Sequence, residues 1–157
     1  MAASELQVAV ILGSKSDEDH LKYLFSEMDM LGIRWEMQVL SAHRQPEALA
    51  DYVHRAEAAK VRVFITAAGL SAALPGVVAS LTILPVIGIP VPAGPLRGVD
   101  ALLSMVQLPG GVPVATVGLG SNGPRNAAHL AAQILALEDA SIRKKIEAYR
   151  KKQQSGS

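Results

Sequence analysis

Short, largely apolar runs alternate with amphipathic segments along this chain. Five such runs are bounded by Gly, Pro or polar residues, as is typical of strands in a covered sheet, and they span residues 8–12, 35–40, 61–67, 86–89 and 113–117. Between and after them, apolar residues recur at three- and four-residue spacing. This spacing predicts helices within residues 21–31, 46–59, 77–81, 96–108, 125–137 and 139–154.

Strands that alternate with helices predict an α/β fold. We expect a three-layer αβα sandwich around a parallel five-stranded sheet, because each crossover must place a helix against a sheet face. Short right-handed crossovers favour the flavodoxin-like, Rossmann-like strand order 2-1-3-4-5. The sequence contains no repeat or linker, so residues 1–157 should form a single domain, with a core over about 8–137 and a C-terminal helix over about 139–154.

Composition narrows the functional classes. Half of the residues are apolar and 18% are charged, which argues against disorder and leaves apolar surface for subunit contacts. A net charge of +1 is too small to indicate a basic surface for nucleic acid. The basic residues within 143–152 are best explained as the solvent-exposed face of the last helix. Without cysteine there can be no disulfide, thiolate metal site or cysteine nucleophile. We expect a soluble, cytoplasmic protein, since neither a leader nor an apolar run of membrane length is seen.

Polar residues follow three of the predicted strands, at the edge where open α/β sheets bind ligands. Ser14, Ser16 and Asp17 follow the first strand, where helix N-terminal amides attract anions, although Ser16 or Asp17 could simply cap the helix. The spacing matches neither a Walker A motif nor GxGxxG. The run after the third strand, residues 67–76, is rich in small residues that let backbone approach a ligand, or that allow tight helix packing.

The turn after the second strand carries the strongest chemical signal. It reads Ser41-Ala42-His43-Arg44. Arg44 suits a phosphate or carboxylate as a charged fork, Ser41 as a neutral donor, and His43 can give and take a proton near neutral pH. In the order 2-1-3 the carboxyl ends of the first three strands are adjacent, so we expect all three polar clusters to converge on one cleft.

Several motifs together resemble the class I PurE family, the N5-carboxyaminoimidazole ribonucleotide mutases of purine biosynthesis. They are GSKSD at 13–17, SAHR at 41–44, ALPG at 73–76, GVDALLSMVQLPGGVPVAT at 98–116 and NAAHLAAQIL at 126–135. The resemblance covers about residues 8–137. It implies conversion of N5-carboxyaminoimidazole ribonucleotide (N5-CAIR) to 4-carboxy-5-aminoimidazole ribonucleotide (CAIR) in a homo-octamer, without metal, ATP or organic cofactor.

The resemblance also implies roles for individual residues. Ser14, Ser16 and Arg44 would hold the 5′-phosphate, and Asp17 the ribose hydroxyls. Ser41 and Ala42 would line the pocket, with His43 as general acid/base. The loop from Gly69, with Leu70, Ser71 and Leu74, would hold the carboxylate or the CO2 in transit. The expected partners are therefore the ribonucleotides N5-CAIR, CAIR and aminoimidazole ribonucleotide (AIR), together with CO2.

Differences from the family's motifs keep a second enzyme reaction open, and a non-catalytic module is a further alternative. The family's usual loop reads roughly AGGAAHLPG, whereas here Leu70 replaces a glycine and Ala73 a histidine, and Glu18 stands where a Trp usually follows GSKSD. Ser71 is similar to the AGRSNAL loop of the class II branch, which carboxylates AIR directly with CO2, so the substrate stays open between the two. A non-catalytic nucleotide-binding or phospho-receiver module is less favoured. A receiver needs acidic residues at the end of the first strand and an aspartate after the third, and this chain has Gly13-Ser14 and Ala67-Ala68-Gly69 at those places.

Overall fold

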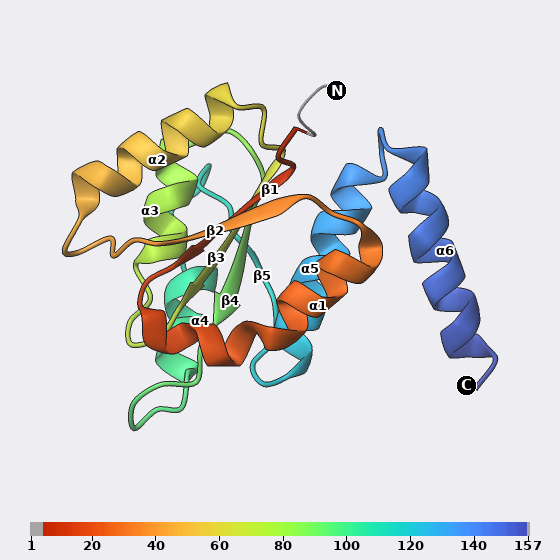
Figure 1. Cartoon of the computed structure of the whole chain (residues 1–157). Helices are drawn as coiled ribbons and strands as arrows, with labels where there is room; N and C mark the ends of the chain where they lie inside the picture. Colours follow the sequence, from red (N-terminus) through yellow and green to blue (C-terminus); the bar gives the residue numbers. More distant parts are fainter. Residues whose placement is uncertain (1–4, 157) are drawn as a thin grey trace.

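A computed structural model, which describes residues 5–156, shows a parallel five-stranded sheet between layers of helices (Figure 1). The strand order is β2-β1-β3-β4-β5, which confirms the predicted topology. The strands are β1 (Val8–Leu12), β2 (Trp35–Val39), β3 (Val63–Ala68), β4 (Val86–Pro90) and β5 (Ala115–Thr116). β1 and β3 lie side by side in the middle of the sheet and are buried on both faces, as their apolar sequences require.

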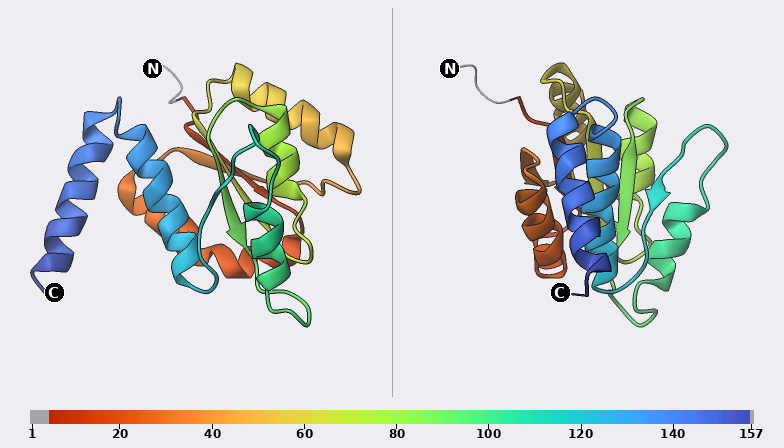
Figure 2. Two further views of the ribbon diagram at one scale, coloured as in Figure 1. Left: turned by 180° about the vertical axis from the view of Figure 1, so that it is seen from behind. Right: turned by 90° about the vertical axis from the view of Figure 1, so that its right-hand side faces the viewer.

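The helices divide between the two faces because successive strand side chains point in opposite directions. Helices α1 (Lys22–Leu31) and α5 (Asn122–Leu135) pack on the face that presents Val8, Val10 and Leu12. On the other face, α2 (Pro46–Ala58), α3 (Leu74–Leu81) and α4 (Val99–Val106) pack against Ala9, Ile11 and Phe64. The last helix, α6 (Ala140–Gln154), lies outside α5, as both views of the ribbon show (Figures 1 and 2).

Some element boundaries differ from those predicted. A 3₁₀ helix, η1 (Lys15–Leu21), precedes α1 where the sequence predicted a turn. Helix α3 begins at Leu74 rather than near Val77, with Pro75 in its first turn. Proline is tolerated there because backbone N–H groups of the first turn have no acceptor within the helix. Helix α5 likewise begins at Asn122, ahead of Pro124.

The Ala-rich face of α5 is used inside the chain. Four alanines of α5 are fully buried against α1 and the sheet, namely Ala127, Ala128, Ala131 and Ala132. Small side chains let these two helices approach closely, so the face is already covered within one chain.

A buried carboxylate joins the same two helices. Glu27 of α1 is almost fully buried, and it pairs with Arg125 Nη1 at 2.5 Å and His129 Nε2 at 3.2 Å, both on α5. The His129 ring also packs on Tyr149 of α6, with ring centroids 4.5 Å apart. This cluster explains His129 as a structural residue.

Within residues 5–156, no helix is long and apolar enough to cross a membrane.

Candidate functional site

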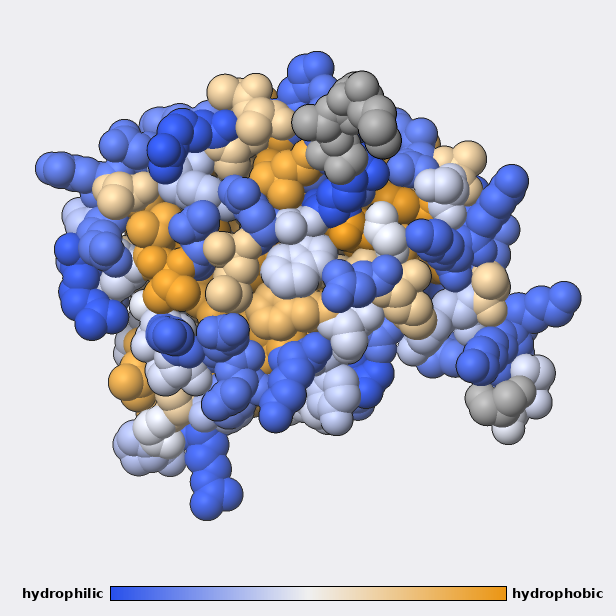
Figure 3. Space-filling view, viewed as in Figure 1, coloured by the Kyte–Doolittle hydropathy of each residue, from blue (hydrophilic) through white to orange (hydrophobic). Residues whose placement is uncertain are grey.

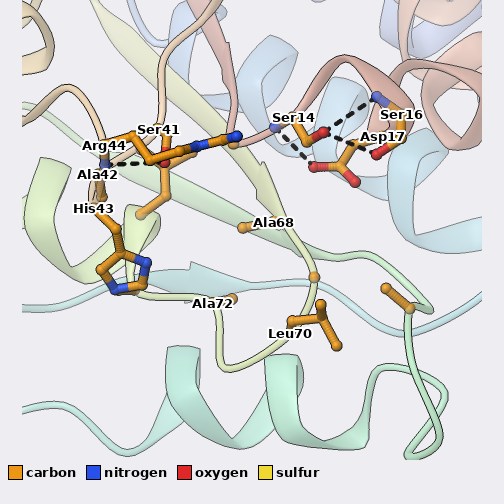
Figure 4. Close-up of a pocket in the computed structure, with 15 residues that line it drawn as sticks. Ser14, Ser16, Asp17, Ser41, Ala42, His43, Arg44, Ala68, Leu70 and Ala72 are labelled. Atoms are coloured by element: carbon orange, nitrogen blue, oxygen red, sulfur yellow. Dashed lines mark hydrogen bonds between the residues drawn. The ribbon is translucent and has the colours of Figure 1, made fainter.

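A cleft of about 430 Å³ opens at the carboxyl edge of the sheet, a size typical of small-molecule sites. The connections after β1, β2, β3 and β4 all contribute to its walls (Figure 4). Every predicted site residue except Ser71 lines it: Ser14, Ser16, Asp17, Ser41, Ala42, His43, Arg44, Gly69, Leu70 and Leu74. The convergence expected from the strand order is therefore present.

The turn after β1 is built as a capping box. Ser14 is the N-cap of η1, and its Oγ accepts from the Ser16 N–H at 3.4 Å and lies 2.9 Å from Ser16 Oγ. In return, the Asp17 carboxylate accepts from the Ser14 N–H at 3.2 Å. Figure 4 shows these three side chains together on one side of the cleft. Ser16 is exposed and Ser14 is partly exposed, so each hydroxyl can also donate to a ligand oxygen.

The Asp17 carboxylate takes part in the capping box of η1 and is also buried. It is only 7% exposed, and burial raises the pKa of its carboxyl above the ordinary value, although the Ser14 N–H and nearby His20 offset part of the rise. Asp17 lies on the cleft wall and accepts from one donor, the Ser14 N–H, among residues 5–156, which leaves acceptor capacity for hydroxyl groups of a ligand. A carboxyl perturbed by desolvation inside a cleft is characteristic of functional sites.

The turn after β2 forms the opposite wall. The Ser41 Oγ accepts from the Arg44 N–H at 3.3 Å, and the Ser41 N–H donates to Gln45 Oε1 at 3.4 Å, just before α2 begins. In Figure 4 the Arg44 side chain extends toward Ser14, whereas the His43 imidazole points away from it, on the side where Ala72 lies. His43 and Arg44 are both exposed and thus accessible to a ligand.

The third wall is apolar and made of small residues. Gly69, Ala72 and Leu74 line it, and Leu70 is 62% exposed at its rim. Ser71 does not line the cleft. Instead, its backbone N–H donates to the Asp100 carboxylate at 2.8 Å, so the expectation that it contacts the ligand is not supported.

Ala93 is a cleft residue that the sequence interpretation missed. It lies in the connection after β4, and a Cβ added to Gly69 would lie only 2.7 Å from the Ala93 Cβ. The predicted strand order could have indicated Ala93, because β4 is the neighbour of β3 and the carboxyl ends of both strands lie at the same edge of the sheet. The close approach requires glycine at position 69.

The cleft thus combines an anion-binding side with an apolar pocket. Arg44 and the two serine hydroxyls can donate to an anion such as phosphate, Asp17 can accept hydrogen bonds, and the His43 imidazole can give and take a proton. No group of three or more His, Asp or Glu residues suited to a metal ion occurs among residues 5–156.

Comparisons with known proteins agree on one family. The family model described as AIR carboxylase matches residues 7–156. An N5-carboxyaminoimidazole ribonucleotide mutase of Vibrio parahaemolyticus is 46% identical over 94% of this chain and 92% of its own length. The protein of the same name from Saccharolobus solfataricus is 48% identical over 91% of this chain and 89% of its own. The crystal structure of Treponema denticola PurE superposes with a TM-score of 0.87 at 31% identity, covering 96% of this chain and 92% of that one.

Proposed function

Because this chain belongs to the AIR carboxylase family, we propose that it is an N5-carboxyaminoimidazole ribonucleotide mutase of purine biosynthesis, which converts N5-CAIR to CAIR. The observation that carries the proposal is the convergence of His43, Arg44 and Asp17 on one small-walled cleft. The mutase names of the relatives support this reaction over direct carboxylation of AIR. The proposed reaction requires no metal or organic cofactor and takes place in the cytoplasm.

The ribonucleotide would bind with its phosphate between the two polar walls. Ser14 and Ser16 donate from one side and the Arg44 guanidinium from the other, which satisfies the phosphate oxygens. Asp17 accepts from the ribose hydroxyls, while Ser41 and Ala42 line the same wall. This arrangement directs the aminoimidazole toward His43 and the Gly69 loop.

One imidazole can serve both proton transfers. Protonated His43 gives its proton to N5 of the carbamate, the bond from N5 to the carboxylate carbon breaks, and CO2 and AIR remain in the cleft. C4 of the electron-rich aminoimidazole then attacks CO2. His43 removes the C4 proton, which yields CAIR and returns the imidazole to its starting state.

The apolar wall has a separate task, which is to retain CO2 between these two steps. Gly69, Leu70, Ala72 and Leu74 offer no strong donor side chain and exclude water from this part of the cleft. Retention holds CO2 next to C4, so the second step is effectively intramolecular.

Substrate choice tests the proposed function. Purified protein is supplied with N5-CAIR, or with AIR and bicarbonate, and CAIR formation is followed. We expect much faster CAIR formation from N5-CAIR at equal concentration. Turnover only with AIR and bicarbonate would instead identify the class II reaction. Ser71, which is similar to the class II loop, suggests that alternative.

The ribose contact predicts an unusual result for Asp17→Asn. A carboxyl whose pKa is higher in the folded than in the unfolded chain loses stabilising free energy as pH rises through those pKa values, so ionised Asp17 destabilises the fold at neutral pH. Asparagine keeps the capping acceptor without the charge. We expect an unchanged or raised melting temperature at pH 7, with KM raised several-fold. A lower melting temperature with unchanged KM would show that Asp17 is only a cap.

We further propose that the chain forms the homo-octamer implied by the family resemblance. One face of α4 is apolar and exposed, since Val99, Leu103 and Val106 recur at helical spacing and each is about half exposed. The connection from α4 to β5 projects from the body of the molecule (Figure 2). On the face shown in Figure 3, polar residues lie between several hydrophobic areas.

The octamer is tested by light scattering at micromolar concentration. The wild-type protein should scatter as a single species of about eight times the 16.5 kDa chain mass, and Leu103→Glu should dissociate it. Leu137→Glu is the matched control, because Leu137 is more exposed than Leu103 but lies outside α4. An active wild-type monomer would contradict the proposal.

A further inference from the structure

The Gly69 loop has an unfavourable backbone conformation. Leu70 (φ 34°) and Ser71 (φ 51°) are consecutive non-glycine residues in the left-handed region, which side chains with a Cβ seldom adopt. Such residues persist only where the surrounding structure holds them, and they are concentrated at functional sites. The contacts that hold this pair therefore bear on the function of the cleft wall.

One of these contacts comes from a residue outside the cleft. Asp100, in the first turn of α4, accepts from the Ser71 N–H at 2.8 Å through Oδ2. Its other oxygen, Oδ1, is buried and has no hydrogen-bond partner among the described residues. A buried acceptor without a partner is unfavourable, so the placement of this carboxylate is not optimised for stability alone.

Packing makes the same loop a fixed neighbour of the connection after β4. A Cβ added to Gly94 would lie 2.5 Å from Leu70 Cδ2, so the Leu70 side chain rests directly on the Gly94 backbone. Gly69 approaches Ala93 in the same way. Gly69, Leu70 and Ala93 all line the cleft, and the next residue along the chain after Leu70, Ser71, makes the bond to Asp100.

We propose that Asp100 is a positioning residue of the mutase reaction. By holding the Ser71 N–H, it fixes the left-handed turn at 70–71 and keeps Gly69 and Leu70 against the 93–94 backbone, which closes the wall that retains CO2. This inference rests on the proposed function. Without the Asp100 bond the turn relaxes toward ordinary backbone angles, the wall loosens, and CO2 leaves before C4 attacks it.

The test measures how N5-CAIR is divided between products. AIR released and CAIR formed are quantified for each variant after subtraction of an enzyme-free blank, which accounts for spontaneous carbamate loss. Asp100→Ala should raise the ratio of AIR to CAIR about tenfold and lower kcat more than it raises KM. Asp100→Asn should stay close to wild type, because its amide oxygen can still accept from the Ser71 N–H.

Asp139→Ala is the matched control. Asp139 caps α6 by accepting from the N–H groups of Ser141 and Ile142, far along the chain from the cleft residues. This variant should lose thermal stability without a change in the product ratio. Should Asp100→Ala be too unstable to isolate, Asp100→Ser replaces it, since serine is too short to reach the Ser71 N–H.

The outcomes separate this inference from the proposed function. A wild-type product ratio in Asp100→Ala would overturn the role of Asp100 while leaving the mutase intact. A raised ratio in Asp139→Ala as well would attribute the effect to general destabilisation and would also overturn it. A wild-type protein that forms no CAIR from N5-CAIR would refute the proposed function itself.

Discussion

Replacing His43 with asparagine should lower CAIR formation from N5-CAIR by about two to four orders of magnitude, the usual contribution of a general acid/base. Asparagine is close to histidine in size and polarity, but it cannot exchange a proton near neutral pH. His43 is exposed on the cleft wall, so its replacement should leave the fold intact. We therefore expect the Kd for CAIR, measured by calorimetry, to change little while kcat falls.

The matched control for this variant is His54→Asn. His54 is an exposed histidine of α2 that does not line the cleft, so its replacement should leave kcat unchanged. Near-normal turnover of His43→Asn would remove His43 from the mechanism. An equal loss in both variants would point to a general effect of replacing histidine.

Replacing Arg44 with alanine should weaken ribonucleotide binding. A hydrogen bond to a charged group contributes about 1.5–3 kcal/mol, which corresponds to roughly a 10- to 150-fold rise in Kd. The phosphate is remote from the reacting carbon, so Arg44 binds ground state and transition state alike, and KM should rise far more than kcat falls. Arg44→Lys should give an intermediate KM, because lysine keeps the charge without the bidentate fork.

Arg55→Ala provides the comparison for Arg44→Ala. Arg55 is an exposed arginine of α2 that does not line the cleft, and its removal changes net charge by the same amount. Its KM should match the wild-type value. If Arg44→Ala bound the nucleotide as tightly as Arg55→Ala, the phosphate would have to be held elsewhere.

The fold could be predicted from the sequence because its determinants are local and repeated. The buried apolar strands β1 and β3, with a helix after each, leave few topologies once crossovers must be short and right-handed. The predicted helix boundaries differ from the structure where one residue type is favoured in two kinds of local structure. The small-residue run that contains Pro75 predicts a loop, but proline is also favoured in the first turn of a helix, and α3 includes Pro75 in its first turn.

The site was predictable to the extent that it lies at strand ends. His43 and Arg44 follow β2 directly, so the strand order alone placed them in the cleft. Asp100 could not be found in this way. Its contact with Ser71 joins positions 29 residues apart, and it depends on a left-handed turn formed by two non-glycine residues, Leu70 and Ser71.

Retention of CO2 is the central claim, and isotope labelling tests it most directly. N5-CAIR that carries ¹³C in its carboxylate is converted in a large excess of unlabelled bicarbonate, and the label in CAIR is measured by mass spectrometry. If the cleft holds CO2 from its release at N5 to its capture at C4, nearly all of the CAIR should keep the label. CAIR labelled only to the level of the surrounding bicarbonate would contradict this account, because the CO2 would then have left the cleft before recarboxylation.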